Sequence, residues 1–578
     1  MPVYNSDIVD IFNEVADLLE IEGANPYRVR AYRNAARTIS TLSRNVSDMV
    51  EAGEDLTEFS GIGEDLAGKI KEIVNTGDLE QLEKIEQRTP PELGDLLDVA
   101  GLGPKRVQTI YEELGVTTME DLKRAAEQGQ IRDLHGLGEK TEQKVLEDVE
   151  RWSAEEERTR RDVAEERVEP LLSFLRELEN VQQVEAAGSY RRKKETVGDL
   201  DVLAISEEGE DVISRFVAYE DVREIISQGE TRSTVVFRSG LHVDLRVVEK
   251  ESYGAALLYF TGSKQHNIAL RNAALDEELK INEYGVWDTT VDSPDQEQVA
   301  GESEAQIYDL FDLPWIPPEL REDRGEIEAA REGHLPNLVS VDDIRGDLQS
   351  HTTASDGRAS LREMADAARR LGRDYLAITD HSGYIGVTRG LDADELAEHI
   401  AEIERLNEET DDFKLLKSVE VDVLEDGSLD LPDKILEKLD LVVFAVHSHF
   451  DLPGDQQTER IIRAMDNPYC NILAHPTGRK IGKRPAYHVD MGRLMDAALE
   501  RGCFLELNAQ PDRLDLNDAQ CRMAKNRGLK VAISTDAHGG DELQFIRYGV
   551  YQARRGWLEP SDVLNTRDWD KLKELLER

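Results

Sequence analysis

The sequence has 578 residues and a formal net charge of -50, which is spread along the chain rather than gathered in an acidic tail. This length exceeds what a single hydrophobic core supports, so several domains are expected. The hydrophobic fraction of 39% falls in periodic segments, which excludes a disordered chain. No apolar run reaches the roughly 18 residues of a membrane span and no basic leader is present, so we expect a cytoplasmic protein. The cysteines are too scattered for a disulfide framework or a zinc knuckle, and are predicted to be small buried hydrophobic residues: Cys470, Cys503 and Cys521.

Residues 1–155 have the periodicity of helices and contain one short glycine motif three times. Each copy reads Gly-x-Gly and precedes a helical pattern. Glycines let the backbone approach a ligand, and the amides of the following helix N-terminus can bind phosphate without reading base sequence. A single copy would indicate an ordinary turn between helices. Three copies resemble helix-hairpin-helix motifs and predict contact with the DNA backbone at Gly61, Gly63, Gly101, Gly103, Gly136 and Gly138.

A glycine-serine turn followed by two aspartates predicts a nucleotidyl-transfer site in the middle of the chain. Gly188 and Ser189 precede a basic run, and Asp199 and Asp201 open an apolar run with strand character. Side chains two apart in a strand leave the same face, so both carboxylates can share metal ions. Asp244, in the strand-like run 241–248, supplies a third carboxylate. Two Mg²⁺ ions about 4 Å apart require three such carboxylates. The alternative interpretation is that these aspartates form a solvated acidic strand end.

The same region resembles the family X DNA polymerases, and the match continues through Tyr-Phe-Thr-Gly-Ser at 259–263 and Ile-Asn-Glu-Tyr at 281–284. The resemblance implies a nucleotidyltransferase palm and thumb, with a cis peptide bond between Gly262 and Ser263. The chain departs from the vertebrate repair branch at His242, where that branch has an arginine. The dNTP-binding residues that the resemblance implies are Gly188, Ser189 and Arg192 at the triphosphate, Tyr259, Phe260 and Gly262 at the sugar, and Asn267 and Arg271 towards the base and template.

Residues 5–84 resemble the small lyase domain of the same family. Lys69 falls where relatives place the amine that forms a Schiff base with an abasic sugar. Because only the neutral amine attacks, burial or a neighbouring cation must lower the pKa of Lys69. Asp65 and Asp78 stand where relatives use lysines to hold the 5′-phosphate. The alternative interpretation of Lys69 is therefore a DNA-contacting or surface lysine.

The strong negative charge conflicts with DNA binding in dilute salt. A chain with a net charge of -50 repels DNA over long distances. At about 1 M salt the Debye length is only about 3 Å, and this repulsion disappears. We therefore infer a salt-rich cytoplasm, as in halophilic archaea.

From Asp347 onward, short apolar runs alternate with helical segments, and successive runs end at side chains that bind metals. In a βα barrel all strand C-termini open onto one face, so residues nearly 200 positions apart converge. A lone histidine after a strand would indicate an ordinary loop residue, but five or more such ends predict a multinuclear metal centre. The segment resembles the PHP (polymerase and histidinol phosphatase) domain, usually a distorted seven-stranded barrel. By that resemblance the Mn²⁺ or Zn²⁺ ligands are His351, Asp356, His381, Glu420, His447, His475, Asp536 and His538.

One ligand of the PHP pattern is replaced. The family begins with Asp-Leu-His-x-His, whereas this chain has Gln349 two residues before His351. An amide oxygen is a weaker donor for Mn²⁺ or Zn²⁺ than an imidazole nitrogen, so one metal is expected to be lost or loosely held. His449, two residues beyond His447, is a candidate replacement.

Together these patterns predict a multidomain protein of α+β and α/β class that fills short gaps in DNA during base excision repair. The predicted protein is a monomer that binds DNA and dNTPs and has a PHP-domain 3′–5′ exonuclease. Two alternatives stay open for the barrel, a small-molecule phosphatase and a non-catalytic DNA-end scaffold. The expected domains are a lyase-like helical domain at 1–85, a helix-hairpin-helix domain at 86–155, a palm at 156–250, a thumb at 251–322, a linker at 323–340 and a PHP barrel at 341–578.

Overall fold

The structure is a computed structural model that describes residues 3–577, except for 41, 43, 60, 100–101, 135–136, 156–157, 291–297, 384–389 and 411. The chain divides into two compact units. Unit 1 comprises Met1–Glu157 and Lys480–Pro485, and unit 2 comprises Arg158–Arg479 and Ala486–Arg578. Among the described residues, no helix combines the length and the apolar character that a membrane crossing requires.

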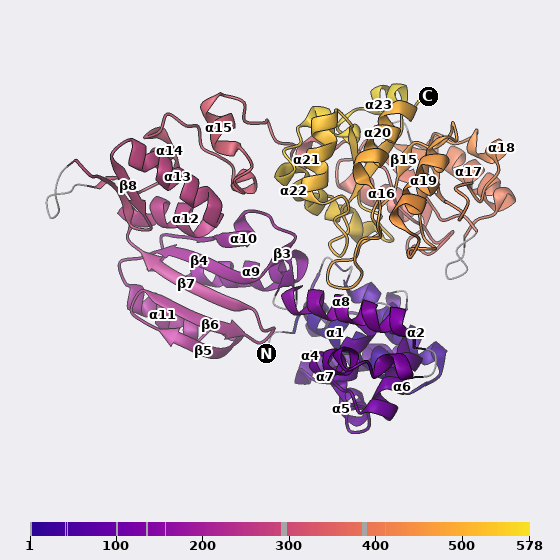
Figure 1. Ribbon diagram of the computed structural model, residues 1–578, viewed down its shortest axis with the longest axis horizontal. Helices are drawn as coiled ribbons and strands as arrows, with labels where there is room; N and C mark the ends of the chain where they lie inside the picture. Colours follow the sequence, from indigo (N-terminus) through magenta and orange to yellow (C-terminus); the bar gives the residue numbers. More distant parts are fainter. Residues whose placement is uncertain are drawn as a thin grey trace. The chain divides into compact units, whose positions relative to one another are not determined.

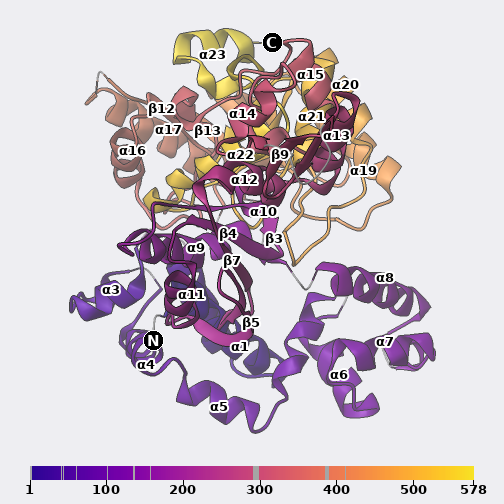
Figure 2. The ribbon, with the colours of Figure 1, turned by 90° about the vertical axis from the view of Figure 1, so that its left-hand side faces the viewer.

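Unit 1 is helical, as predicted (Figures 1 and 2). One core gathers around Phe12 and Tyr32, whose rings meet edge to face with centroids 5.4 Å apart. A second core, between residues 93 and 149, includes Val107, Ile110 and Leu122. The helices are α1 (Asn5–Ile21), α2 (Pro26–Ser40), α3 (Val46–Glu51), α4 (Glu64–Thr76), α5 (Glu80–Glu86), α6 (Pro104–Leu114), α7 (Met119–Glu127) and α8 (Glu139–Glu155).

The three predicted hairpins share one local structure. Each follows a short 3₁₀ turn, at Leu56–Glu58, Asp95–Asp98 or Ile131–Asp133. The amide of a buried residue, Ile62, Leu102 or Leu137, then donates to the carbonyl three residues earlier at 3.1, 2.9 or 3.1 Å. The next residue is Gly63, Gly103 or Gly138, directly before α4, α6 or α8. Gly61 has φ +84°, a conformation that favours glycine, whereas Gly101 and Gly136 lie outside the described residues.

The first part of unit 2 is a five-stranded sheet in the order β2-β4-β7-β6-β5. Helices α9 (Arg161–Arg176) and α11 (Gly209–Val217) share a core with Val202 and Ala204 of β4, and α12 (Tyr253–Thr261) packs on Leu203 and Ile205. Asp199 and Asp201 therefore share the face of β4 that α12 covers further along the strand. The strands are β2 (Gln183–Ala186), β4 (Asp199–Ile205), β5 (Val222–Gln228), β6 (Arg232–Phe237) and β7 (His242–Val248), and the short β1 (Thr159–Arg160) pairs with β3 (Thr196–Val197).

The thumb region follows with α12, α13 (Lys264–Asp276), the three-stranded sheet β10-β9-β8 and α14 (Glu304–Asp309). Its strands are β8 (Leu279–Asn282), β9 (Gly285–Asp288) and β10 (Gln298–Ala300). The predicted linker, 323–340, is partly helical. It contains α15 (Glu326–Arg331), because Ile327 and Ala330 pack into the thumb core and buried Glu326 lies 2.6 Å from His266 Nδ1.

The last part of unit 2 is a parallel seven-stranded barrel, in which the strands follow one another in sequence order from β11 to β17. A bridge between Ser350 and Ala537 joins the first strand's end to the last, and His351 N donates to Ala537 O at 2.7 Å. The predicted barrel is thereby confirmed as nearly closed. Its strands are β11 (Gly346–Asp347), β12 (Tyr375–Ile378), β13 (Lys414–Asp422), β14 (Leu441–Ala445), β15 (Ile472–Leu473), β16 (Phe504–Asn508) and β17 (Val531–Ser534).

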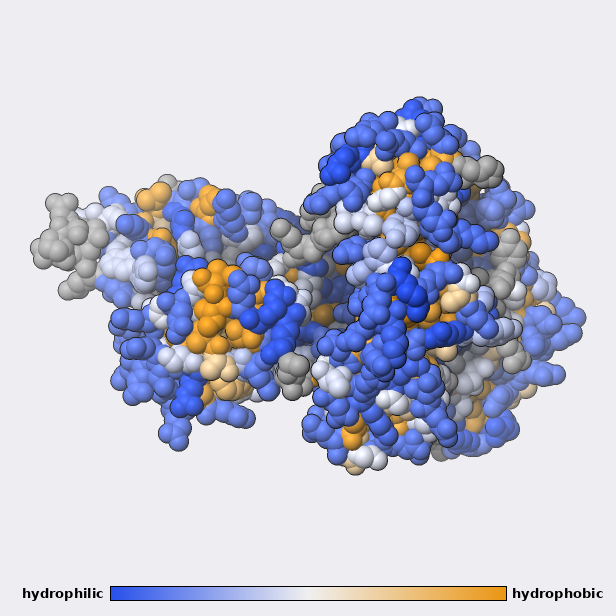
Figure 3. Space-filling model, turned by 90° about the horizontal axis from the view of Figure 1, so that it is seen from below, coloured by the Kyte–Doolittle hydropathy of each residue, from blue (hydrophilic) through white to orange (hydrophobic). Residues whose placement is uncertain are grey.

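Helices cover the outside of the barrel (Figure 1). They are α16 (Leu361–Arg370), α17 (Ala393–Asn407), α18 (Asp433–Leu436), α19 (Gly454–Met465), α20 (Met491–Arg501), α21 (Asp518–Arg527), α22 (Ile546–Arg555) and α23 (Trp569–Leu576). The three cysteines are free and buried in the core that these helices share with the strands, as predicted. The molecular face in Figure 3 is mainly hydrophilic, in keeping with a charged fraction of 33%.

Candidate functional site

Three carboxylates stand on the open face of the palm sheet. β4 and β7 are parallel neighbours, and Asp201 is directly opposite Asp244 in register. Burial, with help from the charges of Asp199 and Asp244, raises the pKa of Asp201 to about 7. A carboxyl group that resists ionisation beside other anions indicates a site where a cation is favoured. Among the described residues, the groups of three or more donor atoms that lie within 4.8 Å of one another are all in the barrel. The three palm carboxylates are therefore further apart than the barrel donors.

The third carboxylate is oriented from strand β6. Asp244 Oδ1 accepts hydrogen bonds from Thr234 Oγ1 at 2.6 Å and from Arg232 Nη2 at 3.3 Å. His242, which replaces the arginine of the vertebrate branch, lies opposite Asp199 at the exposed start of β7. Orientation of Asp244 is therefore provided by a neighbouring strand, a source that the sequence pattern did not reveal.

The glycine-serine turn lies next to these carboxylates. Gly188 has φ +60°, which favours glycine, and a methyl group there would lie 2.9 Å from Asp201 Oδ2 and displace that carboxylate. Gly188 begins the four-residue helix α10 (Gly188–Arg191). The hydroxyl of Ser189 is buried without a protein hydrogen-bond partner. A buried, unpartnered donor beside a carboxylate cluster fits the predicted triphosphate position.

The residues predicted to contact the nucleotide lie on α12 and α13. The rings of Tyr259 and Phe260 meet edge to face at a centroid distance of 4.9 Å, and Arg271 lies 5.2 Å from the Tyr259 ring centroid. Asn267 Nδ2 donates to Tyr259 O at 2.7 Å. The Gly262–Ser263 peptide bond is cis, as the resemblance implied. The structure thus places the predicted sugar-side and base-side residues together around one turn.

Lys69 is not prepared for attack as a neutral amine. Burial lowers its pKa, but contacts with Asp65 and Tyr32 outweigh burial, and the net pKa is raised. Lys69 Nζ forms an ion pair with Asp65 one helical turn earlier and lies 5.3 Å from the Tyr32 ring centroid. The expectation of a lowered pKa is wrong for this arrangement. A role of Lys69 in Schiff-base chemistry stays a prediction.

The predicted barrel ligands converge at the C-terminal ends of the strands. Their donor atoms form three overlapping groups, each within 4.8 Å: His351, Asp356, His381 and His538; His381, Glu420 and His447; His351, Glu420 and Asp536. Glu420 belongs to two groups and is 1% exposed. The eighth predicted ligand, His475, has Nε2 at 3.1 Å from Glu420 Oε1. This set of nitrogen and carboxylate donors suits Mn²⁺ or Zn²⁺.

The electrostatics of the cluster favour cations. Burial lowers the pKa of His447, but the carboxylates of Glu420 and Asp422 outweigh it and raise the pKa to about 10. Burial likewise opposes protonation of His538, yet Asp356 and Asp536 raise its pKa to about 9. Acidic groups that hold protons on two buried imidazoles would hold metal ions in the same way. His351 Nδ1 is buried without a hydrogen-bond partner among the described residues, which agrees with that use.

Gln349 lies where the family has a histidine and is 1% exposed. Neither its amide oxygen nor its amide nitrogen has a hydrogen-bond partner. A buried amide without partners is costly, and a metal contact through the oxygen would satisfy one of its atoms. His449 does not fill the gap, because its side chain is 39% exposed and its nearest carboxylate is Glu425, 4.0 Å away. The suggested replacement by His449 is therefore corrected.

Three carboxylates beside the cluster are not in the predicted ligand set. Asp380 and Asp422 stand at strand ends that the sequence pattern picked out, whereas Glu506 was missed. Asp422 Oδ1 lies 2.9 Å from His447 Nδ1, and Asp380 Oδ2 lies 2.9 Å from His399 Nε2. Glu506 is fully buried on β16, and burial followed by the charge of Asp536 raises its pKa well above the usual range. The signal was present for Glu506, because β16 ends in Leu-Glu-Leu-Asn like the other strands of the series. Such neighbours orient metal-binding side chains.

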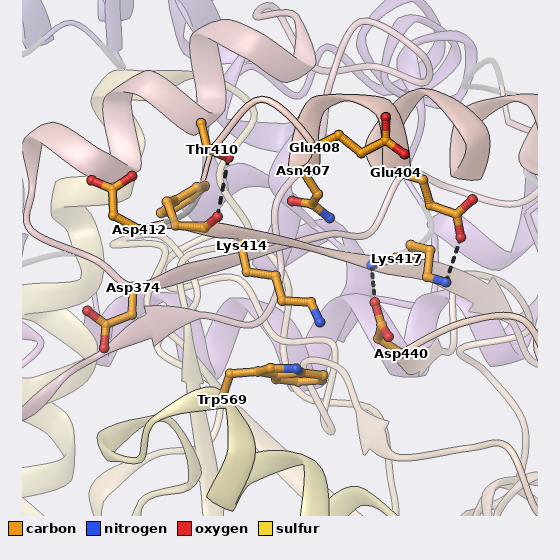
Figure 4. Close-up of a pocket in the computed structure, with 11 residues that line it drawn as sticks. Asp374, Glu404, Asn407, Glu408, Thr410, Asp412, Lys414, Lys417, Asp440 and Trp569 are labelled. Atoms are coloured by element: carbon orange, nitrogen blue, oxygen red, sulfur yellow. Dashed lines mark hydrogen bonds and ion pairs between the residues drawn. The ribbon is translucent and has the colours of Figure 1, made fainter.

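A large surface pocket lies away from this cluster. It has a volume of ≈ 560 Å³ and sits at the start of β12 and β13, beside Asp374 and Lys414, with Trp569 of α23 on one side (Figure 4). Lys414 Nζ is 4.9 Å from the Trp569 ring centroid. The metal-type residues lie at the opposite ends of the strands, so this pocket is not part of their site.

Comparisons with known proteins follow the same order of domains along the chain. A full-length relative in Bacillus subtilis, "DNA polymerase/3'-5' exonuclease PolX", is 37% identical over 578 residues, 100% of each chain. A "Probable phosphatase" of Thermoanaerobacter sp. is 31% identical over 242 residues, 40% of this chain and 94% of that protein. DNA polymerase lambda of Arabidopsis thaliana is 26% identical over 351 residues, 55% of this chain and 62% of that one.

Family models match five consecutive segments. They are a helix-hairpin-helix domain at 3–79, a SAM-like helix-hairpin-helix tandem at 93–151, the DNA polymerase beta palm at 158–236, the DNA polymerase beta thumb at 256–322 and a PHP domain at 347–490. The palm segment contains Asp199 and Asp201, and the PHP segment contains six of the eight barrel residues described above. The remaining residues of both clusters, Asp244, Asp536 and His538, lie outside these segments but within the end-to-end match to the Bacillus subtilis relative. The chain belongs to the family X DNA polymerases that carry a C-terminal PHP domain.

Proposed function

We propose that this chain fills short gaps in DNA during base excision repair and trims 3′ ends with a separate site in its barrel. Its family makes it a DNA polymerase with 3′–5′ exonuclease activity, which acts on DNA and nucleotides with divalent metal ions. The observation that carries the polymerase assignment is the register of Asp201 and Asp244 on neighbouring parallel strands, next to the glycine turn at Gly188. A phosphatase alone needs neither this turn nor the DNA-binding hairpins.

In the palm, Asp199, Asp201 and Asp244 would hold two Mg²⁺, which activate the primer 3′-hydroxyl and neutralise the triphosphate. Ser189 and Arg192 would bind the triphosphate oxygens. The Ser189 hydroxyl is buried without a protein partner directly after Gly188, and Arg192 is the C-cap of the same short helix. The other dNTP contacts proposed here come from α12 and α13: Tyr259, Phe260, Gly262, Asn267 and Arg271. The hairpin glycines of unit 1 leave backbone amides available for DNA phosphates.

In the barrel, the eight predicted ligands and the amide oxygen of Gln349 would hold Mn²⁺ or Zn²⁺ for phosphodiester cleavage at DNA 3′ ends. A second candidate for this site, a small-molecule phosphatase, is favoured by the barrel's match to proteins named probable phosphatases. We also propose that Lys69 supports 5′-deoxyribose-phosphate lyase activity, that the protein works in a salt-rich cytoplasm and that it is a monomer. Light scattering on the purified chain tests the monomer.

The two centres are tested by inactivating each one in the full chain. Asp199→Asn combined with Asp201→Asn should abolish primer extension, because two amides cannot neutralise the cations, while 3′-end cleavage persists. Glu420→Gln should have the opposite effect, because it removes the carboxylate shared by two ligand groups. Extension and cleavage are measured on gapped DNA and on a 3′-labelled strand. Loss of both activities in a folded palm variant would contradict the two-centre assignment.

Nucleotide hydrolysis by the same preparations separates nuclease from phosphatase. If the barrel is a nuclease, the parent protein should cleave DNA 3′ ends but hydrolyse free nucleotides only slowly. Glu420→Gln should then abolish the cleavage of DNA 3′ ends. Rapid hydrolysis of nucleotides, without cleavage of DNA, would assign the barrel to the phosphatase class.

A further inference from the structure

The last turn of barrel helix α22 lies against the nucleotide-binding turn of the palm. Arg555, which is 3% exposed, donates from Nη1 to the backbone oxygen of Arg192 at 2.8 Å and to Glu322 Oε1 at 2.9 Å. Its Nη2 donates to Asp518 Oδ2 of the barrel at 2.7 Å. One buried arginine of the barrel is thus bonded to the main chain of the residue proposed to bind the triphosphate.

The guanidinium of Arg192 is held on two sides. Nε donates to Glu322 Oε1 at 3.0 Å, and Nη1 donates to Thr261 O at 2.5 Å. Among the described residues, no hydrogen bond to protein is found for Nη2 of Arg192. A methyl group at Gly262 would lie 3.3 Å from Arg192 Nη1, so the glycine makes room for the guanidinium. Arg192 is therefore fixed in direction and keeps one amino group for an anionic ligand.

Glu322 is shared between the two arginines. Burial raises the pKa of Glu322, but Arg555 and Arg192 outweigh burial and lower the pKa to about 2. Because Glu322 is shared with Arg555, it neutralises Arg192 less than it would in a one-to-one pair. If Arg555 were absent, Glu322 and Arg192 would form a neutral pair, and less charge would remain for a triphosphate.

Neighbouring contacts extend the same interface along the turn. Glu195 accepts hydrogen bonds from Gln552 Nε2 of α22 at 3.0 Å and from Arg479 Nη2 at 2.7 Å. Further along α22, Tyr548 Oη donates to Glu165 Oε2 of α9 at 2.8 Å. Helix α22 therefore contacts Arg192 and Glu195 of this segment and, separately, helix α9 of the palm.

We propose that Arg555 of the barrel is a positioning residue for dNTP binding at the polymerase site. It fixes the main chain of Arg192 and shares Glu322, so that Arg192 keeps the direction and charge that bind the triphosphate. The barrel is then a structural part of the polymerase nucleotide site as well as the seat of a second activity. This inference rests on the proposed role of Arg192.

The test is steady-state gap filling by the full chain with one dNTP. Arg555→Ala should raise KM for the dNTP about tenfold, the effect of losing about 1.4 kcal/mol of binding, with a smaller change in kcat. The 3′–5′ exonuclease rate should stay within about twofold, because Arg555 contacts none of the barrel ligands. Arg554→Ala is the matched control. Arg554 joins the same helix to Glu319 Oε1 at 2.8 Å and to Val339 O at 3.1 Å without touching the turn, so its KM should be unchanged.

A rescue variant separates positioning from simple attachment of the barrel. Glu322→Gln added to Arg555→Ala should recover part of the lost dNTP affinity, because it removes the anion that neutralises Arg192. An unchanged KM in Arg555→Ala overturns the proposal. Equal effects of Arg554→Ala and Arg555→Ala, with no rescue, also overturn it in favour of a purely structural contact.

Arg192→Ala shows which proposal has failed. A raised KM in Arg192→Ala with a normal KM in Arg555→Ala refutes the positioning role alone. A normal KM in Arg192→Ala refutes the assignment of the triphosphate to this turn, and the positioning role with it.

Discussion

Replacing Glu304 by glutamine should strongly destabilise the junction of palm and thumb. Glu304 is 6% exposed and its carboxylate accepts five hydrogen bonds. Arg191 donates two at 2.8 and 2.9 Å, Arg321 donates two at 2.6 and 3.2 Å, and Trp315 donates one at 2.9 Å. Arg321 is fully buried, so its charge has no access to water in compensation.

The magnitude follows from the charges that the change leaves behind. Glutamine fits the space, but its side-chain NH₂ would face guanidinium groups that are themselves donors. It also lacks the negative charge that neutralises those groups. Removing one partner of a buried ion pair costs about 3–5 kcal/mol. Burial raises the pKa of Glu304, and Arg321 and Arg191 outweigh burial and lower it far below its usual range. The stabilisation is therefore complete at neutral pH, above the unfolded pKa, and is lost only as the pH falls through the lowered folded pKa.

The assay is the urea midpoint at which tryptophan fluorescence and primer-extension activity are lost. A slope of about 1–3 kcal/mol per M urea converts the expected cost into a midpoint lowered by roughly 1–5 M. Glu302→Gln is the matched control, because Glu302 is exposed and should change stability by less than about 0.5 kcal/mol. Dependence of dNTP KM on Glu304 is expected as well, since Arg191 directly precedes Arg192. A midpoint that matches the control would refute the argument that this triad stabilises the junction.

Three further predictions concern the other centres. Gln349→His should raise both the Mn²⁺ or Zn²⁺ bound per chain and the 3′–5′ exonuclease rate, and His351→Ala should lower both. Equal metal content and equal rate in the parent protein and both variants would mean that the barrel has no catalytic metal site. Asp65→Asn should increase the yield of the adduct that borohydride traps with 5′-deoxyribose-phosphate DNA near neutral pH, because it removes an anion that raises the pKa of Lys69. If the adduct persists in Lys69→Ala, Lys69 is not the Schiff-base amine and is assigned to DNA contact. Polymerase activity should rise between about 0.1 M and about 1 M KCl, because salt screens the repulsion between the acidic protein and DNA and so opposes the usual loss of DNA affinity with salt. A steady fall in activity, in a protein that stays folded, would contradict the salt-rich setting.

Local patterns in the sequence were sufficient for the elements that carry the chemistry. The two-residue period of a strand placed Asp199 and Asp201 on one face, and repeated strand ends predicted the gathered ligands of the barrel. The ion pair of Lys69 with Asp65 was also within reach, because side chains four apart on a helix are neighbours. The raised pKa of Lys69 therefore follows from a pattern that was present but was not used.

Contacts between distant segments left no such pattern. Arg555 and Arg192 are 363 positions apart in the sequence, and Arg191 and Glu304 are 113 positions apart. Each residue alone looks like an ordinary charged side chain in an acidic protein. The same holds within the predicted linker 323–340, where Glu326 looks like a solvated charge in the sequence but is buried against His266 of α13. Burial of a charged residue depends on its partner, and the partner is fixed by tertiary structure.

Backbone groups explain how so acidic a chain can approach DNA. Gly63 and Gly103 are the N-caps of α4 and α6, and neither offers a side chain to accept from the first amides of its helix. Those amides and the positive end of the helix dipole attract phosphate whatever the net charge. The hairpins are not equivalent, because the first turn of α4 contains Glu64 and Asp65, whereas that of α6 has no acidic residue. Carboxylates in the first turn compete with phosphate, so we expect the α6 hairpin to be the stronger of these two proposed sites for a DNA backbone.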